Sequence, residues 1–114
     1  MLAPRTTPVM STLTGISTAV FGADNNDNGK RYALLAGRGL TAGGYYQTVI
    51  GRYNTAVDGA AIVVGNGSEG APKNTFIVSL GGDINQVGAI TASGKIKTTK
   101  NLETGTGIKV GAEI

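Results

Sequence analysis

The sequence predicts an all-β protein in which short strands stack as a β-solenoid or β-roll. Four short apolar runs each end on a glycine, and these glycines are 15, 14 and 14 residues apart: Gly22, Gly37, Gly51 and Gly65. The bulky apolar residues are mostly Val and Ile, which favour strands. The longest stretch without Gly or Pro, 95–104, has no apolar stripe at helical spacing, so no long helix is expected.

The repeat continues between the apolar runs. Thr41-Ala42 recurs as Thr55-Ala56, and Arg38 recurs as Arg52. A fixed period with apolar and turn residues in the same phase marks a repeated supersecondary unit. Each unit, a strand of about four residues and a turn, is too small to bury its own apolar side, whereas stacked copies can do so.

The supply of core residues is thin. Leu, Ile, Val and Phe make up 27 of the 114 residues, and Trp and Cys are absent. A chain of this size with so little bulky apolar side-chain volume is expected to complete its core between subunits.

The sequence divides into three expected segments: an extended N-terminal arm over 1–18, a repeat domain over 19–80 and a Gly-x-Ile segment over 81–114. In the arm, Pro4 and Pro8 forbid a helix and favour extended backbone. Two interpretations stay open: a frayed terminus, or an arm that docks on a partner surface. For docking, the expected attachment residues are Leu2, Pro4, Arg5, Pro8, Val9 and Met10.

Beyond Gly81 the period changes from about 14 residues to six. Gly82-Asp83-Ile84, Gly88-Ala89-Ile90 and Gly94-Lys95-Ile96 repeat at the shorter spacing, and 105–108 and Gly111 continue the pattern less regularly. Such a hexad places one β-branched residue inward per unit, with glycine at each bend. This predicts a narrow fibrous β-structure, such as strands from three chains winding around one axis.

Two motifs suggest ligand sites but fit turns better. Residues 24–29, Asp-Asn-Asn-Asp-Asn-Gly, match the opening of a calcium loop, yet Leu35 stands where a bidentate carboxylate is needed. Residues 65–70 satisfy the dinucleotide pattern G-x-G-x-x-G, but a strand rather than a helix is expected after them. We therefore expect no metal and no cofactor.

Composition disfavours several other classes of function. The net charge is only +3, and the basic residues are spread out without interleaved aromatics, so no nucleic-acid partner is expected. With no His or Cys and with every carboxylate in or beside a turn, we expect a protein that is not an enzyme and has no catalytic residues. The sequence shows no signal peptide and no membrane-length apolar run, so we expect synthesis in the cytoplasm and no membrane insertion.

The repeats resemble the head repeats of trimeric autotransporter adhesins. In that family an apolar-x-apolar-Gly strand is followed by small residues three and five places after the glycine, and then by Gly or Asp two places later. Gly51 is followed in this way by Asn54, Ala56 and Asp58. The preceding unit keeps the later positions, but Leu40 stands where the first small residue is expected.

Residues 47–67 are also similar to stretches in fibre and appendage proteins of tailed phages and prophages. There, head-like repeats pass into a strand like 74–78 and then into Gly-x-Ile hexads. An autotransporter itself is disfavoured, because a signal peptide, a long coiled-coil stalk and membrane-anchor strands are missing from this sequence. The resemblance covers about 19–96 and implies a parallel homotrimer whose expected core residues are Val20, Leu35, Val49, Ile50, Ile62, Val64, Ile84, Ile90 and Ile96.

The resemblance implies a structural role in a virion. We expect a short fibre, a spike or a capsid decoration protein that is anchored by its N-terminal arm to other virion proteins of the capsid or tail. The alternative is an adhesin module that binds a glycan or protein of the host surface. Its expected ligand face is Tyr45, Tyr46, Arg52 and Tyr53, although these tyrosines also suit simple packing along the outside of the roll.

Overall fold

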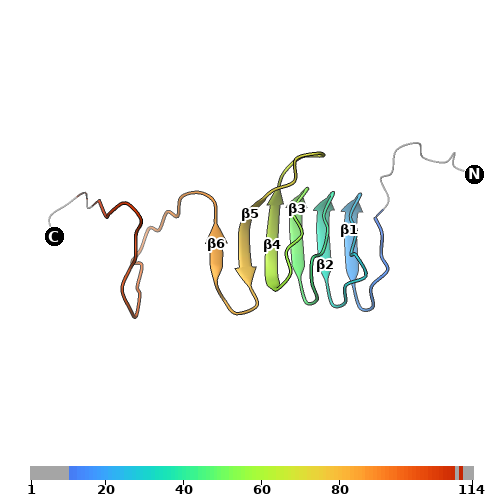
Figure 1. The fold of residues 1–114 in the computed structure, drawn as a ribbon, viewed down its shortest axis with the longest axis horizontal. Coiled ribbons are helices and arrows are strands. Elements are labelled where there is room, and N and C mark those ends of the chain that lie inside the picture. The colour runs from blue at the N-terminus through green and yellow to red at the C-terminus, as the bar shows by residue number, and fades with distance from the viewer. Residues whose placement is uncertain (1–10, 110, 112–114) are drawn as a thin grey trace, which may run out of the picture.

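The computed structural model describes residues 11–109 and 111, and in that part of the chain it contains six strands and no helix. The strands form one sheet in sequence order (Figure 1). The predicted all-β class is therefore confirmed. The strands are β1 (Ala19–Ala23), β2 (Leu34–Arg38), β3 (Thr48–Arg52), β4 (Ala60–Asn66), β5 (Asn74–Ser79) and β6 (Ile84–Gln86).

Strands β1 to β4 are the repeating part of the sheet. Each pairs in parallel with the next, and the register places Gly22 opposite Gly37, Gly37 opposite Gly51 and Gly51 opposite Gly65. Each connection therefore returns the chain to the start of a neighbouring strand, which makes one coil of a solenoid. The predicted β-solenoid and its repeat are confirmed. The parallel series ends at β4, because β5 and β6 pair antiparallel to their predecessors.

The core lies between the sheet and the connecting loops. One inward side chain from each parallel strand forms a row, and in register these are Val20, Leu35, Val49 and Val63. The last three are fully buried, and Val20 packs against them. The loops complete the core with the buried side chains of Ala33, Leu40 and Ala42, and Ala60 at the start of β4 is buried with them.

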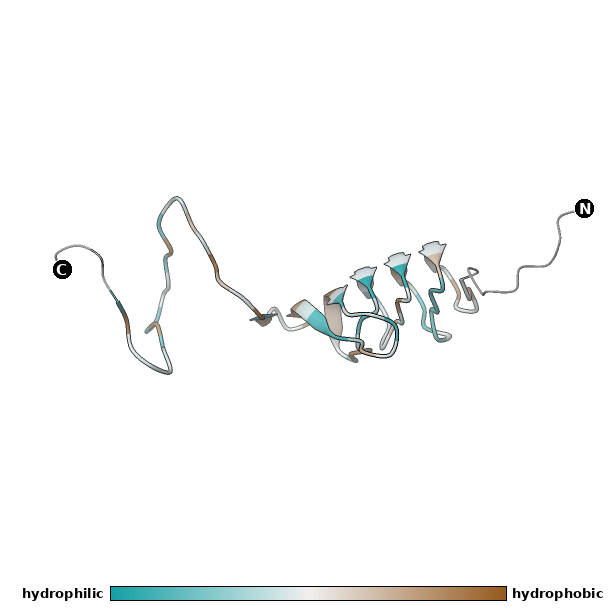
Figure 2. Cartoon of the chain, turned by 90° about the horizontal axis from the view of Figure 1, so that it is seen from above, coloured by the Kyte–Doolittle hydropathy of each residue, from teal (hydrophilic) through white to brown (hydrophobic). Residues whose placement is uncertain are grey.

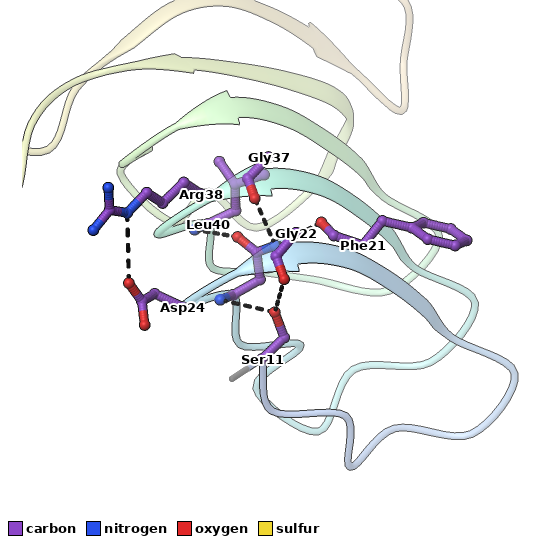
Figure 3. A network of polar contacts seen from close by, with 8 residues as sticks. Ser11, Phe21, Gly22, Asp24, Gly37, Arg38 and Leu40 are labelled. Carbon is purple, nitrogen blue, oxygen red and sulfur yellow. Dashed lines mark hydrogen bonds and ion pairs between the residues drawn. The ribbon is translucent and has the colours of Figure 1, made fainter. Parts of the chain in front are cut away.

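Two buried asparagines bond the backbone where the chain leaves a strand. The Asn25 side chain accepts from the Leu40 N–H at 2.9 Å and donates to the carbonyl oxygens of Phe21 and Gly37. Figure 3 shows this network reaching from Ser11 to Gly37 and Leu40. Asn54 lies two coils after Asn25 and bonds back to both the N–H and the C=O of Thr41. Leu40 therefore fits the core, because the amides of adjacent coils satisfy the backbone around it.

The glycines that end the strands are required by the close stacking of coils. At Gly37 the backbone has φ of +146°, and a Cβ atom added there would lie 1.9 Å from the carbonyl oxygen of Gly51. Gly22 meets the same obstacle at the carbonyl oxygen of Gly37. Any side chain at these positions would force neighbouring coils apart and break the parallel ladder.

The N-terminal coil is held by a buried carboxylate. Asp27 is fully buried and accepts from the N–H groups of Thr14 and Gly15, each at 2.7 Å, and from the Thr14 hydroxyl at 2.8 Å. Residues 11–18 therefore belong to the first coil of the solenoid rather than to a free arm. The expected attachment residues all lie outside the described part of the chain: Leu2, Pro4, Arg5, Pro8, Val9 and Met10.

The loop over 24–29 forms turns, and Asp27 is used for these structural bonds. Among the described residues there is no group of three or more acidic, His or Cys side chains that could hold a metal ion.

Past β6 the chain leaves the sheet (Figure 1). Residues 87–109 contain no strand and are exposed throughout. Within the described residues of 81–114, the single chain shows only the short strand β6 in place of the expected fibrous β-structure.

We predict that Gly37→Ala destabilises the protein by more than about 3 kcal/mol, because the new methyl group collides with backbone that cannot move aside. Gly70→Ala is the matched control: its φ is also positive, at +83°, but nothing lies within 4 Å of the added atom. The control should cost only about 1 kcal/mol of backbone strain. Urea unfolding of the two variants measures both values, and equal losses would refute the steric explanation.

We further predict that acid weakens the fold through Asp27. Burial by itself raises the pKa of this carboxyl, but hydrogen bonds from Gly15, Thr14 and Gly29 outweigh it and hold the pKa below its ordinary value of 3.8. A lowered folded-state pKa means that ionised Asp27 stabilises the fold above pH 3.8, and that this contribution disappears as the pH falls through the folded-state pKa.

Asp27→Asn should lower the free energy of unfolding at neutral pH by about 2 kcal/mol, because its amide group faces hydrogen-bond donors. It should also flatten the loss of stability below pH 4 relative to the unaltered chain. Thermal unfolding between about pH 2 and pH 7 checks this. A variant that loses stability on acidification as steeply as the unaltered chain would contradict the assignment.

Candidate functional site: the uncovered face of the sheet

The side of the sheet that points away from the core is mostly apolar. Along each strand the side chains alternate between faces, so the neighbours of the inward row point outward. Register aligns these neighbours across β1 to β4 into two rows. On β5, Ile77 packs against the core, which places Phe76 and Val78 outward. The outer face, as we call this surface, consists of Ala19, Phe21, Leu34, Ala36, Thr48, Ile50, Ile62, Val64, Phe76, Val78, Ile84 and Gln86.

The outer face is open to solvent. Its exposed side chains include Phe21 at 62%, Ile50 at 39% and Ile84 at 63% of their accessible area. The Phe21 side chain projects away from the polar network behind the sheet (Figure 3). Figure 2 shows the connecting loops gathered on one side of the strands only. None of the twelve outer-face positions is charged. A contiguous apolar surface of this kind is typical of an interaction site, and parallel strands are ordinarily covered on both faces.

The structure divides the expected trimer-core residues between several environments. Val20, Leu35 and Val49 pack inside the single chain, whereas Ile50, Ile62, Val64 and Ile84 lie on the outer face. Ile90 and Ile96 lie beyond β6 and are exposed at 70% and 69%.

Sequence reasoning missed four large outer-face residues: Phe21, Leu34, Phe76 and Val78. The alternation of side chains along a strand could have identified them, because apolar residues directly before and after each inward residue must point to the outer face.

A second surface feature lies in the turns that precede the strands. Tyr32 and Tyr46 occupy the turns before β2 and β3, both with positive φ, and their rings stack with centroids 5.0 Å apart. The Lys30 ammonium lies 5.6 Å from the centroid of the Tyr45 ring. These turns border an open pocket of about 350 Å³ lined by Lys30, Gly44, Tyr45, Tyr46, Asp58 and Leu80.

The expected ligand face is not brought together as one surface. Tyr45 and Tyr46 precede β3, whereas Arg52 is the last residue of that strand and Tyr53 follows it. The Tyr53 ring packs across Gly39, where an added Cβ atom would lie 2.3 Å from it. Arg52 lines a separate pocket of about 200 Å³ and donates to the Asn66 side chain at 3.3 Å. Lys30 and Asp58, which share the first pocket with the tyrosines, were not expected from the sequence.

Polar side chains line up at the C-terminal ends of the strands. Arg38 lies 3.6 Å from the carboxylate of Asp24 on the preceding coil, and the register places Arg38 beside Arg52. Arg38 is exposed and Asp24 is half-buried, and an ion pair this open to solvent contributes little to stability. Polar side chains therefore border the outer face at both ends of the strands.

Comparison with known proteins adds no relative. No protein-family model, curated protein sequence or solved structure matches the chain. In the described part of the chain, no helix has the length and apolar character needed to cross a membrane.

Proposed function

We propose that this chain is a non-enzymatic structural protein of a tailed-phage virion, a homotrimeric short fibre, spike or capsid decoration protein. The observation that carries the proposal is the uncharged apolar outer face, which the chain leaves open although its strands run parallel. Three copies are proposed because residues 19–96 resemble repeats found in parallel trimers.

The outer face suits copies of the same chain. Its two rows repeat once per coil at the spacing between neighbouring strands, about 4.8 Å. An identical sheet presents the same spacing, so side chains of two copies can interleave coil by coil. Covering each large exposed side chain contributes on the order of 1 kcal/mol, and the absence of charge on the face removes the desolvation penalty that would oppose contact.

The shape of the chain also supports a projecting or bridging role. Its radius of gyration is 18.2 Å, whereas a compact domain of this length is expected near about 13 Å. The principal extents are 70 × 25 × 23 Å, so the chain is drawn out along one direction. The segment beyond β6 supplies part of this length (Figure 1). The stacked coils supply the rest, and a stack of coils suits the projecting body of a fibre or decoration protein.

We predict that a charge on the outer face dissociates the trimer. Ile50→Lys and Ile62→Lys each place an ammonium group in the shared apolar contact, where its burial is unfavourable. Light scattering at several concentrations should give the mass of three chains for the unaltered protein and of one chain for either variant. Thr55→Lys is the control, because Thr55 is exposed in the loop between β3 and β4. A monomeric unaltered protein would refute the proposal.

We also predict that the first ten residues attach the protein to the particle. The deletion should stop at residue 10, because residues 11–18 form part of the first coil and hold it through Asp27. Purified virions that lack the protein should take up the full chain but not the shortened one, as measured by co-sedimentation. Failure of the full chain to bind any virion component would count against a virion role.

The pocket beside Tyr45 and Tyr46 favours a second candidate, an adhesin that binds a host glycan. Exposed aromatic rings with a lysine and an aspartate nearby combine an apolar platform with hydrogen-bonding groups. The deletion of residues 1–10 separates the two roles, because an adhesin would keep its ligand after the deletion whereas an attachment protein would lose its particle.

A further inference from the structure

The six-residue period beyond β6 runs further than the glycines indicate. A large apolar residue stands at every sixth position through to the end of the sequence: Ile84, Ile90, Ile96, Leu102, Ile108 and Ile114. The glycine two places earlier is kept in the first three units only, since Lys100, Thr106 and Ala112 replace it afterwards. The spacing of the apolar residues, rather than the glycine, is therefore the constant feature of this segment.

The backbone repeats with the same period. It bends at 87–88, 93–94, 99–100 and 105–106, and each bend comes two to three residues before the next large apolar residue. The bends at 99–100 and 105–106 include Lys100 and Thr106 where earlier units have glycine. The structure thus contains four successive bends in one phase, and a six-residue unit is a conformational repeat as well as a sequence repeat.

This repeat has no partner within the described chain. The row residues remain exposed: Ile90 at 70%, Ile96 at 69%, Leu102 at 61% and Ile108 at 64%. Between 88 and 109, no backbone hydrogen bond joins one unit to another. Charged side chains flank the row without entering it, as Lys95 and Lys97 do on either side of Ile96. A regular, exposed apolar row that is flanked by charged residues is suited to pack against another apolar row of the same period.

We propose that residues 84–109 fold against the same residues of other copies of this chain, with their Ile and Leu rows meeting unit by unit along a shared axis. This inference rests on the self-association put forward as the proposed function and assigns it a second contact. A copy of the chain supplies a row of the same period and phase. An unrelated apolar surface has no reason to match a six-residue spacing over four units.

The two contacts are continuous. Ile84 pairs with Val78 in the register of β5 and β6, so it belongs to the outer face, and it is also the first residue of the six-residue row. Copies that meet through the outer face therefore bring their rows to the same axis at residue 84. Because residues 88–109 form no backbone–backbone hydrogen bond within the described chain, we infer that their order depends on that association.

Amide hydrogen exchange of the full-length protein tests the inference, with light scattering on the same samples. In the associated protein, amides of 88–109 should exchange at least about tenfold more slowly than in an unstructured peptide of that sequence. Leu102→Glu should abolish this protection, because it places several carboxylates at the shared axis. Asn101→Glu introduces the same charge one residue off the row and should preserve the protection.

The outcomes separate the two proposals. Association without slowed exchange in 88–109 overturns this inference and leaves the self-association of the outer face standing. Slowed exchange in a single chain shows that the segment folds on its own chain, and equal protection in Leu102→Glu and the unaltered protein shows that the row is not the contact; either result overturns the inference. Protection that arises only after binding to a virion assigns the segment to another protein and also overturns it.

Discussion

The stacking of each coil on the next, one strand spacing away, is the constraint on which the rest of the structure depends. At that distance the backbone of Gly22, Gly37 and Gly51 approaches the next coil so closely that a Cβ atom cannot be placed there. The same proximity lets one buried amide serve two coils, as Asn25 does when it bonds Phe21 on its own coil and Leu40 on the next. Glycine spacing, parallel register and buried asparagines are therefore consequences of a single geometric requirement.

That requirement explains which parts of the fold could be read from the sequence. The glycine spacing, together with the residues that recur between the glycines, predicted the stacked repeat. The structure adds that the strands are parallel and that the glycines lie in register. The choice of face was harder to predict. Val49 and Ile50 are adjacent and both apolar, and only their phase relative to the core separates the buried residue from the exposed one. When both faces of a sheet are apolar, composition cannot distinguish a residue that packs inside its own chain from one that points outward.

The side chains at the ends of the strands show a second limit on what the sequence can predict. Tyr46 and Arg52 are only six residues apart in the sequence, but β3 runs between them, so they lie at opposite ends of that strand. Conversely, Lys30 and Asp58 are far apart in the sequence and meet at one pocket because successive turns stack. Proximity in a solenoid follows the coil number and the phase within the coil, so residues about 14 positions apart are neighbours. The same rule stacks Tyr32 on Tyr46.

The end of the parallel series directs where further contacts can form. Strand β5 runs antiparallel to β4, and β6 runs antiparallel to β5. Because β6 is only three residues long, it leaves few free backbone groups with which another strand could pair at that end of the sheet. The apolar surface that remains lies along the outer face and continues through Ile84 into the exposed six-residue row. Association at this surface brings copies side by side. Each coil contributes similar side chains to the outer face, so the area covered by the association we propose grows with every coil and with every six-residue unit beyond them. A charge placed anywhere along such a contact has to be buried there, which is why one substitution is expected to oppose the whole contact.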